Sequence, residues 1–211
     1  IGAQRLDELL RAWFEAHAFQ SVTTEQFRDW LQVWLRERAP GQVDLDRVDE
    51  WLYRPGLPAF AELRHSEVLT KIDGQRKEWL AGRLPLDALP VGDCSVYQWQ
   101  HFLDGMPFDL PRERAAQLDR AFQLSRSGNA EIVFSWLLVA IRARYEPAQQ
   151  RLEHFLVSIG RRKLIRPLYE ALMKTDDGRV FARRNYAQAR PGYHPIAVAT
   201  LDPIVYGTRV P

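Results

Sequence analysis

The chain is poor in cysteine, with Cys94 alone among 211 residues. One cysteine excludes an internal disulfide and a metal site built from several thiolates, and it suits a reducing compartment such as the cytoplasm. Long apolar runs are absent as well. The longest near-apolar run, residues 133–141, is far shorter than the roughly 20 residues that a membrane-spanning helix needs. We therefore expect no membrane-spanning segment.

The sequence also lacks the common catalytic motifs. No two of its five histidines lie within five residues of each other, and no HExxH is present, so a helical two-histidine zinc site cannot be built locally. A P-loop, a GxGxxG fingerprint and a nucleophile elbow are missing too. An isolated histidine is usually a surface or packing residue. We expect this chain to bind no metal or cofactor.

Aromatic residues and charge are plentiful. The chain is 46% hydrophobic, has 24 aromatic residues and carries a formal net charge of +2, which excludes a disordered chain. The charge is uneven, because residues 1–153 have 19 basic and 23 acidic side chains whereas residues 154–211 have 10 and 4. This basic C-terminal region predicts an anionic partner of some kind.

Apolar residues recur at helical spacing throughout the chain, and no strand pattern of useful length is present. Near the N-terminus the stripe consists of Leu6, Leu9, Leu10, Trp13 and Phe14. A second stripe follows Thr23 and Gln26, which are in capping-box register. From residue 95 to residue 201, successive helices are separated by short breaks, which favours antiparallel neighbours and stacked helix pairs. The sequence predicts an all-α protein.

The strongest chemical signal is the run Gly160-Arg-Arg-Lys-Leu-Ile-Arg-Pro167. Gly160 ends one expected helix and Pro167 opens the next, so we expect residues 160–167 to form a turn between helices. In an extended segment Arg161 and Lys163 would project the same way and could grip one carboxylate, whereas on a helix they would diverge by about 200°. The alternative is a group of solvated cations near helix ends.

A second basic group lies further along, at Arg179, Arg183, Arg184 and Arg190. Three of these share a face at helical spacing and could contact nucleic acid. No nucleic-acid-binding motif accompanies them, so a solvated or interdomain face is the better interpretation.

Four separated segments resemble the C-terminal part of the leukotriene A-4 hydrolase family of zinc aminopeptidases, metallopeptidase family M1. They are residues 21–60 (SVTTEQFRDWL…VDEWLYRPGLPAF), residues 129–148 (NAEIVFSWLLVAIRARYEPA), residues 160–172 (GRRKLIRPLYEAL) and residues 193–196 (YHPI). Their order covers nearly the whole chain.

The resemblance implies three regions. Residues 1–58 would be the last helices of a thermolysin-like catalytic domain, residues 59–92 a connecting helix and extended linker, and residues 93–211 the family's C-terminal α-α superhelix, an armadillo-like right-handed solenoid of helix pairs. The first residue is Ile1 and not methionine, so we expect a longer parent chain. The family's zinc ligands and catalytic residues would all lie upstream, and this fragment alone should be inactive.

One functional feature of the family falls inside the chain. The family binds the substrate's carboxylate with an arginine and a lysine in RxK spacing before an RPL segment, and the matching residues here are Arg161 and Lys163. Arg162, between them, departs from the family's bulky apolar residue. The resemblance therefore implies that Arg161 and Lys163 anchor short peptides with a free carboxylate.

We interpret the chain as the scaffold and carboxylate anchor of a zinc aminopeptidase. Its partners would be the catalytic and N-terminal domains of its own parent chain and short peptide substrates, with no nucleic acid and no membrane. Zinc would belong to the parent enzyme, and epoxide hydrolysis is not assumed. Two alternatives stay open: a stand-alone α-solenoid that binds another protein, and, less favoured, a basic helical protein that binds nucleic acid.

Overall fold

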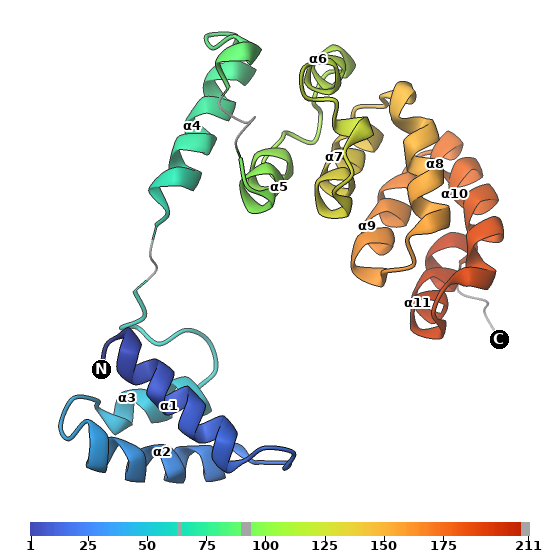
Figure 1. The fold of residues 1–211 in the computed structure, drawn as a ribbon. Helices are drawn as coiled ribbons and strands as arrows, with labels where there is room; N and C mark the ends of the chain where they lie inside the picture. Colours follow the sequence, from blue (N-terminus) through green and yellow to red (C-terminus); the bar gives the residue numbers. More distant parts are fainter. Residues whose placement is uncertain (63–64, 90–93, 208–211) are drawn as a thin grey trace. The chain divides into compact units, whose positions relative to one another are not determined.

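The computed structural model describes residues 1–62, 65–89 and 94–207, and these contain helices and no strand (Figure 1). The all-α prediction is confirmed. The chain divides into two compact units, residues 1–64 and residues 65–211. The described residues include no helix long and apolar enough to cross a membrane.

The first unit has three helices: α1 (Ala3–Ala16), α2 (Thr24–Arg38) and α3 (Leu45–Tyr53). Thr23 and Gln26 form the expected capping box at the start of α2, with each side chain accepting from the other residue's backbone N–H. Arg28 on α2 binds Asp49 on α3 through two hydrogen bonds of 2.9 and 3.0 Å. This forked pair holds α2 against α3.

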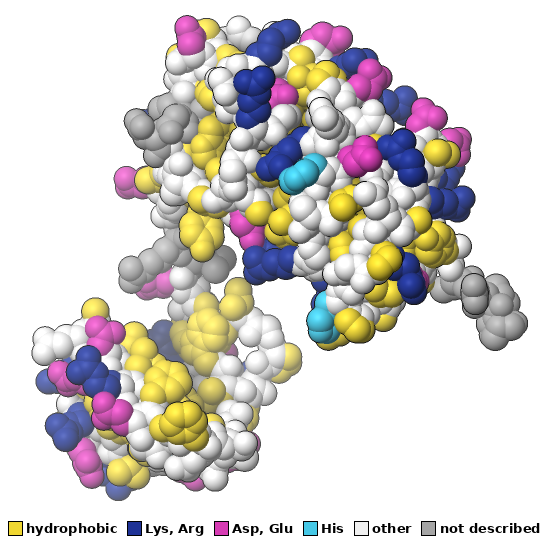
Figure 2. All heavy atoms as spheres, turned by 45° about the vertical axis from the view of Figure 1, so that its right-hand side comes forward, with side chains coloured by type: hydrophobic (Ala, Val, Ile, Leu, Met, Phe, Trp, Pro, Cys, Tyr) yellow, Lys and Arg dark blue, Asp and Glu magenta, His cyan; other side chains and the backbone are white. Residues whose placement is uncertain are grey.

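The predicted stripe on α1 is only half covered. Leu9 is buried with residues of α2 and Trp13 packs edge-on against Trp30, but Leu6, Leu10 and Phe14 are 47%, 41% and 67% exposed. Hydrophobic side chains are visible at the surface of this unit (Figure 2). An apolar face this continuous usually packs against another surface.

The second unit begins with α4 (Glu67–Leu80) and a short 3-10 turn at Leu86–Ala88. Its remaining helices alternate between two layers, as Figure 1 shows. One layer contains α5 (Val96–Asp104), α7 (Ala130–Arg142), α9 (Arg162–Leu172) and α11 (Pro195–Tyr206), and the other contains α6 (Arg112–Phe122), α8 (Gln149–Ser158) and α10 (Asp176–Ala189). This arrangement is a solenoid of helix pairs.

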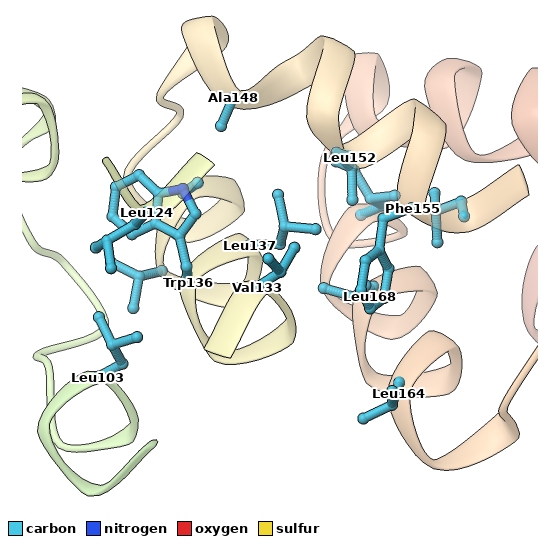
Figure 3. Close-up of a cluster of buried hydrophobic side chains, with 14 of the residues drawn as sticks. Leu103, Leu124, Val133, Trp136, Leu137, Ala148, Leu152, Phe155, Leu164 and Leu168 are labelled. Atoms are coloured by element: carbon cyan, nitrogen blue, oxygen red, sulfur yellow. The ribbon is translucent and has the colours of Figure 1, made fainter. Parts of the chain in front are cut away.

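The core of this unit lies between the two layers, and Figure 3 shows part of it. The stripe predicted at the centre of the chain provides its middle: Val133, Trp136 and Leu137 on α7 are completely buried. The indole N–H of Trp136 donates to Ser125 Oγ at 2.9 Å, so the large ring is buried without an unpaired donor. Because α7 contacts both α5 and α9, it fixes the spacing of the first layer.

The prediction of a turn at residues 160–167 is wrong. Only residues 159–161 connect the helices, because α9 begins at Arg162 and contains Pro167. Proline inside a helix costs about 3 kcal/mol or more. Burial of an aliphatic side chain contributes about 1.5–3 kcal/mol, and α9 buries four of them, at Leu164, Ile165, Leu168 and Leu172. Packing therefore outweighs the cost of the proline.

Candidate functional site: a cationic pair on one carboxylate

Arg161 and Lys163 lie at the start of α9. Arg161 is the N-cap, with an extended backbone (φ −73°, ψ 109°), and Lys163 is the second helical residue. Their side chains are 63% and 62% exposed. Both cations are therefore available to a ligand from solvent.

The two side chains converge on Glu131, in the first turn of the neighbouring helix α7. Arg161 Nη1 lies 2.9 Å from Glu131 Oε1, and Lys163 Nζ lies 3.3 Å from Glu131 Oε2. The Glu131 side chain is only 24% exposed, and its backbone N–H donates to the capping side chain of Asn129. One carboxylate is thus held by both cations, one on each oxygen.

A third contact reaches the same carboxylate from α5. Gln100 Nε2 donates to Glu131 Oε2 at 3.2 Å. Glu131 therefore connects α5, α7 and α9, the first three helices of one layer. Gln100 and Glu131 were not found by sequence reasoning, because contacts across 31 residues leave no local pattern.

The electrostatics of this place favour an anion. The first turn of α9 carries Arg161, Arg162 and Lys163 and no acidic residue, and a helix N-terminus is itself partly positive. With Glu131, the Arg161–Lys163 pair keeps a charge of +1. Arginine offers five N–H donors and lysine three, so Glu131 leaves donors on both cations for a second carboxylate. The arrangement is chemically suited to binding a monoanion.

Arg162 behaves differently from its two neighbours. Its Nη1 donates to Thr200 Oγ1 on α11 at 3.3 Å, and no contact with Glu131 is present among the described residues. The α9 N-terminus therefore offers two cations to one carboxylate and directs the third toward α11.

The basic group further along the chain is used within the domain. Arg190 makes two hydrogen bonds to Asp202, at 2.8 and 2.7 Å, and Arg183 Nε donates to the carbonyl oxygen of Val205. Arg184 pairs with Glu153, and Arg179 pairs with Asp176. Arg183 and Arg190 therefore contact α11, and Arg184 contacts α8. These partly exposed contacts fit the predicted solvated face, and each of them lies within the second unit.

No metal-binding group was found in the described part of the chain. Within it, no three His, Cys, Asp or Glu side chains lie close enough to hold an ion. His17 packs against Trp13 with its ring tilted, His101 binds Asp73, and His194 caps α11 by accepting the backbone N–H of Ile196. These three histidines have structural contacts, and the residues described here do not fit a zinc site.

Residues 94–205 match the family model described as leukotriene A4 hydrolase, C-terminal. The chain belongs to this family. The match covers more than half of the chain and includes Arg161, Lys163, Glu131 and Gln100. Three of the four segments that resemble the family, residues 129–148, 160–172 and 193–196, lie inside this match, and the resemblance to the family is confirmed.

Curated relatives of this leukotriene A4 hydrolase-type chain are named aminopeptidases. Aminopeptidase RNPEPL1 of Mus musculus is 30% identical over 219 residues, covering 97% of this chain and 30% of the relative. Leucine aminopeptidase 2 of Pyricularia oryzae is 28% identical over 211 residues, covering 96% and 34%. The chain thus spans about a third of the length of these relatives.

A solved structure has the same fold. Yeast LTA4 hydrolase in complex with bestatin matches with a TM-score of 0.70 and 24% identity, covering 94% of this chain and 35% of that one. This likeness supports the helical architecture of the family's C-terminal domain.

Proposed function

We propose that this chain is the C-terminal scaffold and substrate-carboxylate anchor of a zinc-dependent aminopeptidase that removes N-terminal residues from short peptides. The family assignment and the names of the relatives support the enzyme class. The observation that carries the anchoring role is the convergence of Arg161 and Lys163 on the two oxygens of one carboxylate, that of Glu131. A peptide's terminal carboxylate presents the same two oxygens.

In this proposal the rest of the parent chain holds zinc, which when bound activates water for peptide hydrolysis. Residues 1–58 would complete the catalytic domain, and residues 93–211 would form the superhelical domain. Residues 59–92 would be the helix and extended linker that connect these two domains. The exposed face of α1, with Leu6, Leu10 and Phe14, would pack against the rest of the catalytic domain in the parent chain. This chain alone would be inactive, and its single cysteine suits a cytoplasmic enzyme.

The role of the cationic pair is positioning. A peptide held at its carboxylate by Arg161 and Lys163, and at its amine by the catalytic domain, keeps one peptide bond at a fixed place. A hydrogen bond to a charged group is worth about 1.5–3 kcal/mol, which corresponds to about 10- to 150-fold in kcat/KM. This is the loss that we expect from Arg161→Ala.

The test uses the full-length parent protein and two substrates, a tripeptide with a free carboxylate and the same tripeptide as its amide. Arg161→Ala and Lys163→Ala should lower kcat/KM for the free acid and change it little for the amide. Arg162→Ala is the matched control, since Arg162 contacts Thr200 and not Glu131. Equal losses on both substrates, or a parent protein without peptidase activity, would contradict the proposal.

A further inference from the structure

Glu131 is the most enclosed member of the cationic cluster. Its side chain is 24% exposed, against 63% for Arg161 and 62% for Lys163. It accepts hydrogen bonds from both cations and from Gln100. Its three donors come from the two neighbouring helices α5 and α9 and contact both carboxylate oxygens. A carboxylate held in this way should stay in place when a ligand arrives, so a ligand should add to Glu131 and not displace it.

The charge balance then depends on the ligand. Arg161, Lys163 and Glu131 sum to +1 before binding. One ligand carboxylate brings the sum to zero, and a ligand with two carboxylates brings it to −1, with Glu131 within 3.3 Å of both cations that the ligand must share. A ligand carboxylate bound to the same two cations lies about 7 Å from Glu131, and at this distance the two negative charges repel each other even in a solvated site.

We propose that Glu131 is a resident counter-ion that makes this site selective for a single carboxylate and unfavourable for dicarboxylate ligands, such as peptides that end in aspartate or glutamate. Gln100 positions Glu131 through its hydrogen bond and, being neutral, adds no further charge. The inference rests on the proposed function, because it assumes that Arg161 and Lys163 bind the ligand's terminal carboxylate.

Two substitutions should act in opposite directions. Glu131→Gln keeps the size and an acceptor oxygen but removes the negative charge, and Gln100→Glu adds a negative charge beside it. At a separation of about 7 Å and an effective dielectric constant between about 40 and 80, one unit charge changes an equilibrium by about 3- to 7-fold. We expect Glu131→Gln to shift the ratio of the two dissociation constants toward the dicarboxylate by this factor and Gln100→Glu to shift it the other way.

The experiment is an NMR titration of the chain of residues 1–211, which follows the arginine Nε–Hε signals. The probes are the tripeptides Ala-Gly-Ala and Ala-Gly-Glu and the amide of Ala-Gly-Ala, at neutral pH and low salt. Glu153→Gln is the matched control, because Glu153 forms an exposed ion pair with Arg184 outside the cluster. Circular dichroism melting curves check that each variant is folded. Damage to the fold would move both cluster variants in the same direction.

Opposite shifts in the ratio for Glu131→Gln and Gln100→Glu, with none for Glu153→Gln, support the proposal. An unchanged ratio in Glu131→Gln, while Arg161→Ala abolishes binding of both acids, overturns the role of Glu131 and leaves the anchor intact. If Arg161→Ala binds both acids as the unaltered chain does, or if neither acid binds to the unaltered chain, the anchoring role itself is wrong and this inference falls with it.

Discussion

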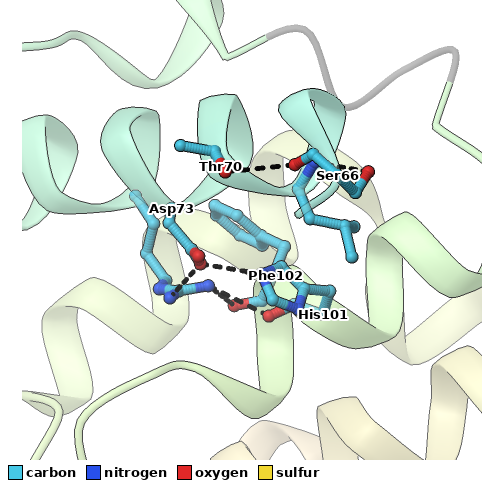
Figure 4. Close-up of polar contacts among 7 residues, drawn as sticks. Ser66, Thr70, Asp73, His101 and Phe102 are labelled. Carbon is cyan, nitrogen blue, oxygen red and sulfur yellow. Dashed lines mark hydrogen bonds and ion pairs between the residues drawn. The ribbon is translucent and has the colours of Figure 1, made fainter. Parts of the chain in front are cut away.

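His101 Nε2 lies 2.8 Å from Asp73 Oδ1, and this contact joins α5 to α4 (Figure 4). Arg76 extends it: its Nη2 binds the same Asp73 oxygen at 2.6 Å, and its Nη1 donates to the carbonyl oxygen of His101 at 2.9 Å. The Asp73 carboxylate therefore accepts from both His101 and Arg76, and Arg76 also holds the backbone of α5. The network fastens α4 to the first helix of the solenoid.

The Asp73 network should stabilise the protein in a pH-dependent way. Burial alone would raise the pKa of Asp73, but the hydrogen bond from His101 and the charge of Arg76 lower it below its ordinary value of 3.8. A lowered pKa adds stability above the unfolded-state pKa, and this stability is lost as pH falls through the folded-state pKa. Because Asp73 is 45% exposed, Asp73→Asn should cost only about 0.5–1 kcal/mol at pH 7.

Urea unfolding of the unaltered chain and of Asp73→Asn, at pH 7 and at a pH below 3, measures this contribution. The difference in unfolding free energy should be present at pH 7 and vanish at the lower pH. Asp104→Asn serves as the control, since Asp104 is exposed at the end of α5 and forms no ion pair within the described residues. A difference that persists unchanged at low pH would show that the Asp73 charge is not its source.

Gly178 permits a close approach at the start of α10. A Cβ atom there would lie 2.1 Å from the carbonyl oxygen of Leu172 and 2.7 Å from Thr175 Oγ1, whose side chain caps the helix by accepting the Gly178 N–H. Gly178→Ala should therefore force the connection between α9 and α10 to shift, at a cost of about 1–3 kcal/mol in unfolding free energy. Thermal or urea unfolding checks the loss.

Gly74 provides the matched control for Gly178. It lies inside α4, and an added Cβ would meet no atom within 4 Å. Gly74→Ala should raise the unfolding free energy by about 0.5–1 kcal/mol, because alanine has the better helix propensity. If both substitutions changed stability in the same direction, the contact with Leu172 would not be the reason for glycine at position 178.

Helix positions were predictable wherever the signals are local. The capping box of Thr23 and Gln26 and the buried run around Trp136 depend on residues within a few positions of each other, and the structure confirms both. The sequence predicts the start of α9 wrongly, because Pro167 is a strong local signal against a helix whereas the burial that overrides it involves neighbouring helices.

The candidate site likewise has one part that local sequence signals predict and another part that only the packing of helices brings together. The spacing of Arg161 and Lys163 is visible in the sequence, and their exposure agrees with an accessible pair. Glu131 and Gln100 are distant in sequence and become neighbours only through the packing of α5, α7 and α9. An extended segment would bring the two side chains to the same side. In the structure, the extended backbone of Arg161 alone, with two long side chains, is sufficient.

Pro167 itself offers the last test. Pro167→Ala restores an N–H that can donate to the carbonyl oxygen of Lys163, and removing proline from a helix interior gains about 3 kcal/mol. Two effects reduce this gain by about 1 kcal/mol each: the unfolded chain becomes more flexible without proline, and the burial of the proline ring is lost. The unfolding free energy should therefore rise by about 1 kcal/mol. Pro195 begins α11, where proline fits, and Pro195→Ala should lower stability by about 0.4–1 kcal/mol. Urea unfolding of both variants measures the two signs. If Pro167→Ala instead lowers the unfolding free energy, the prediction is wrong. Packing of the half-buried proline ring would then stabilise the N-terminal part of α9, which carries Arg161 and Lys163, by more than the missing helix hydrogen bond destabilises it.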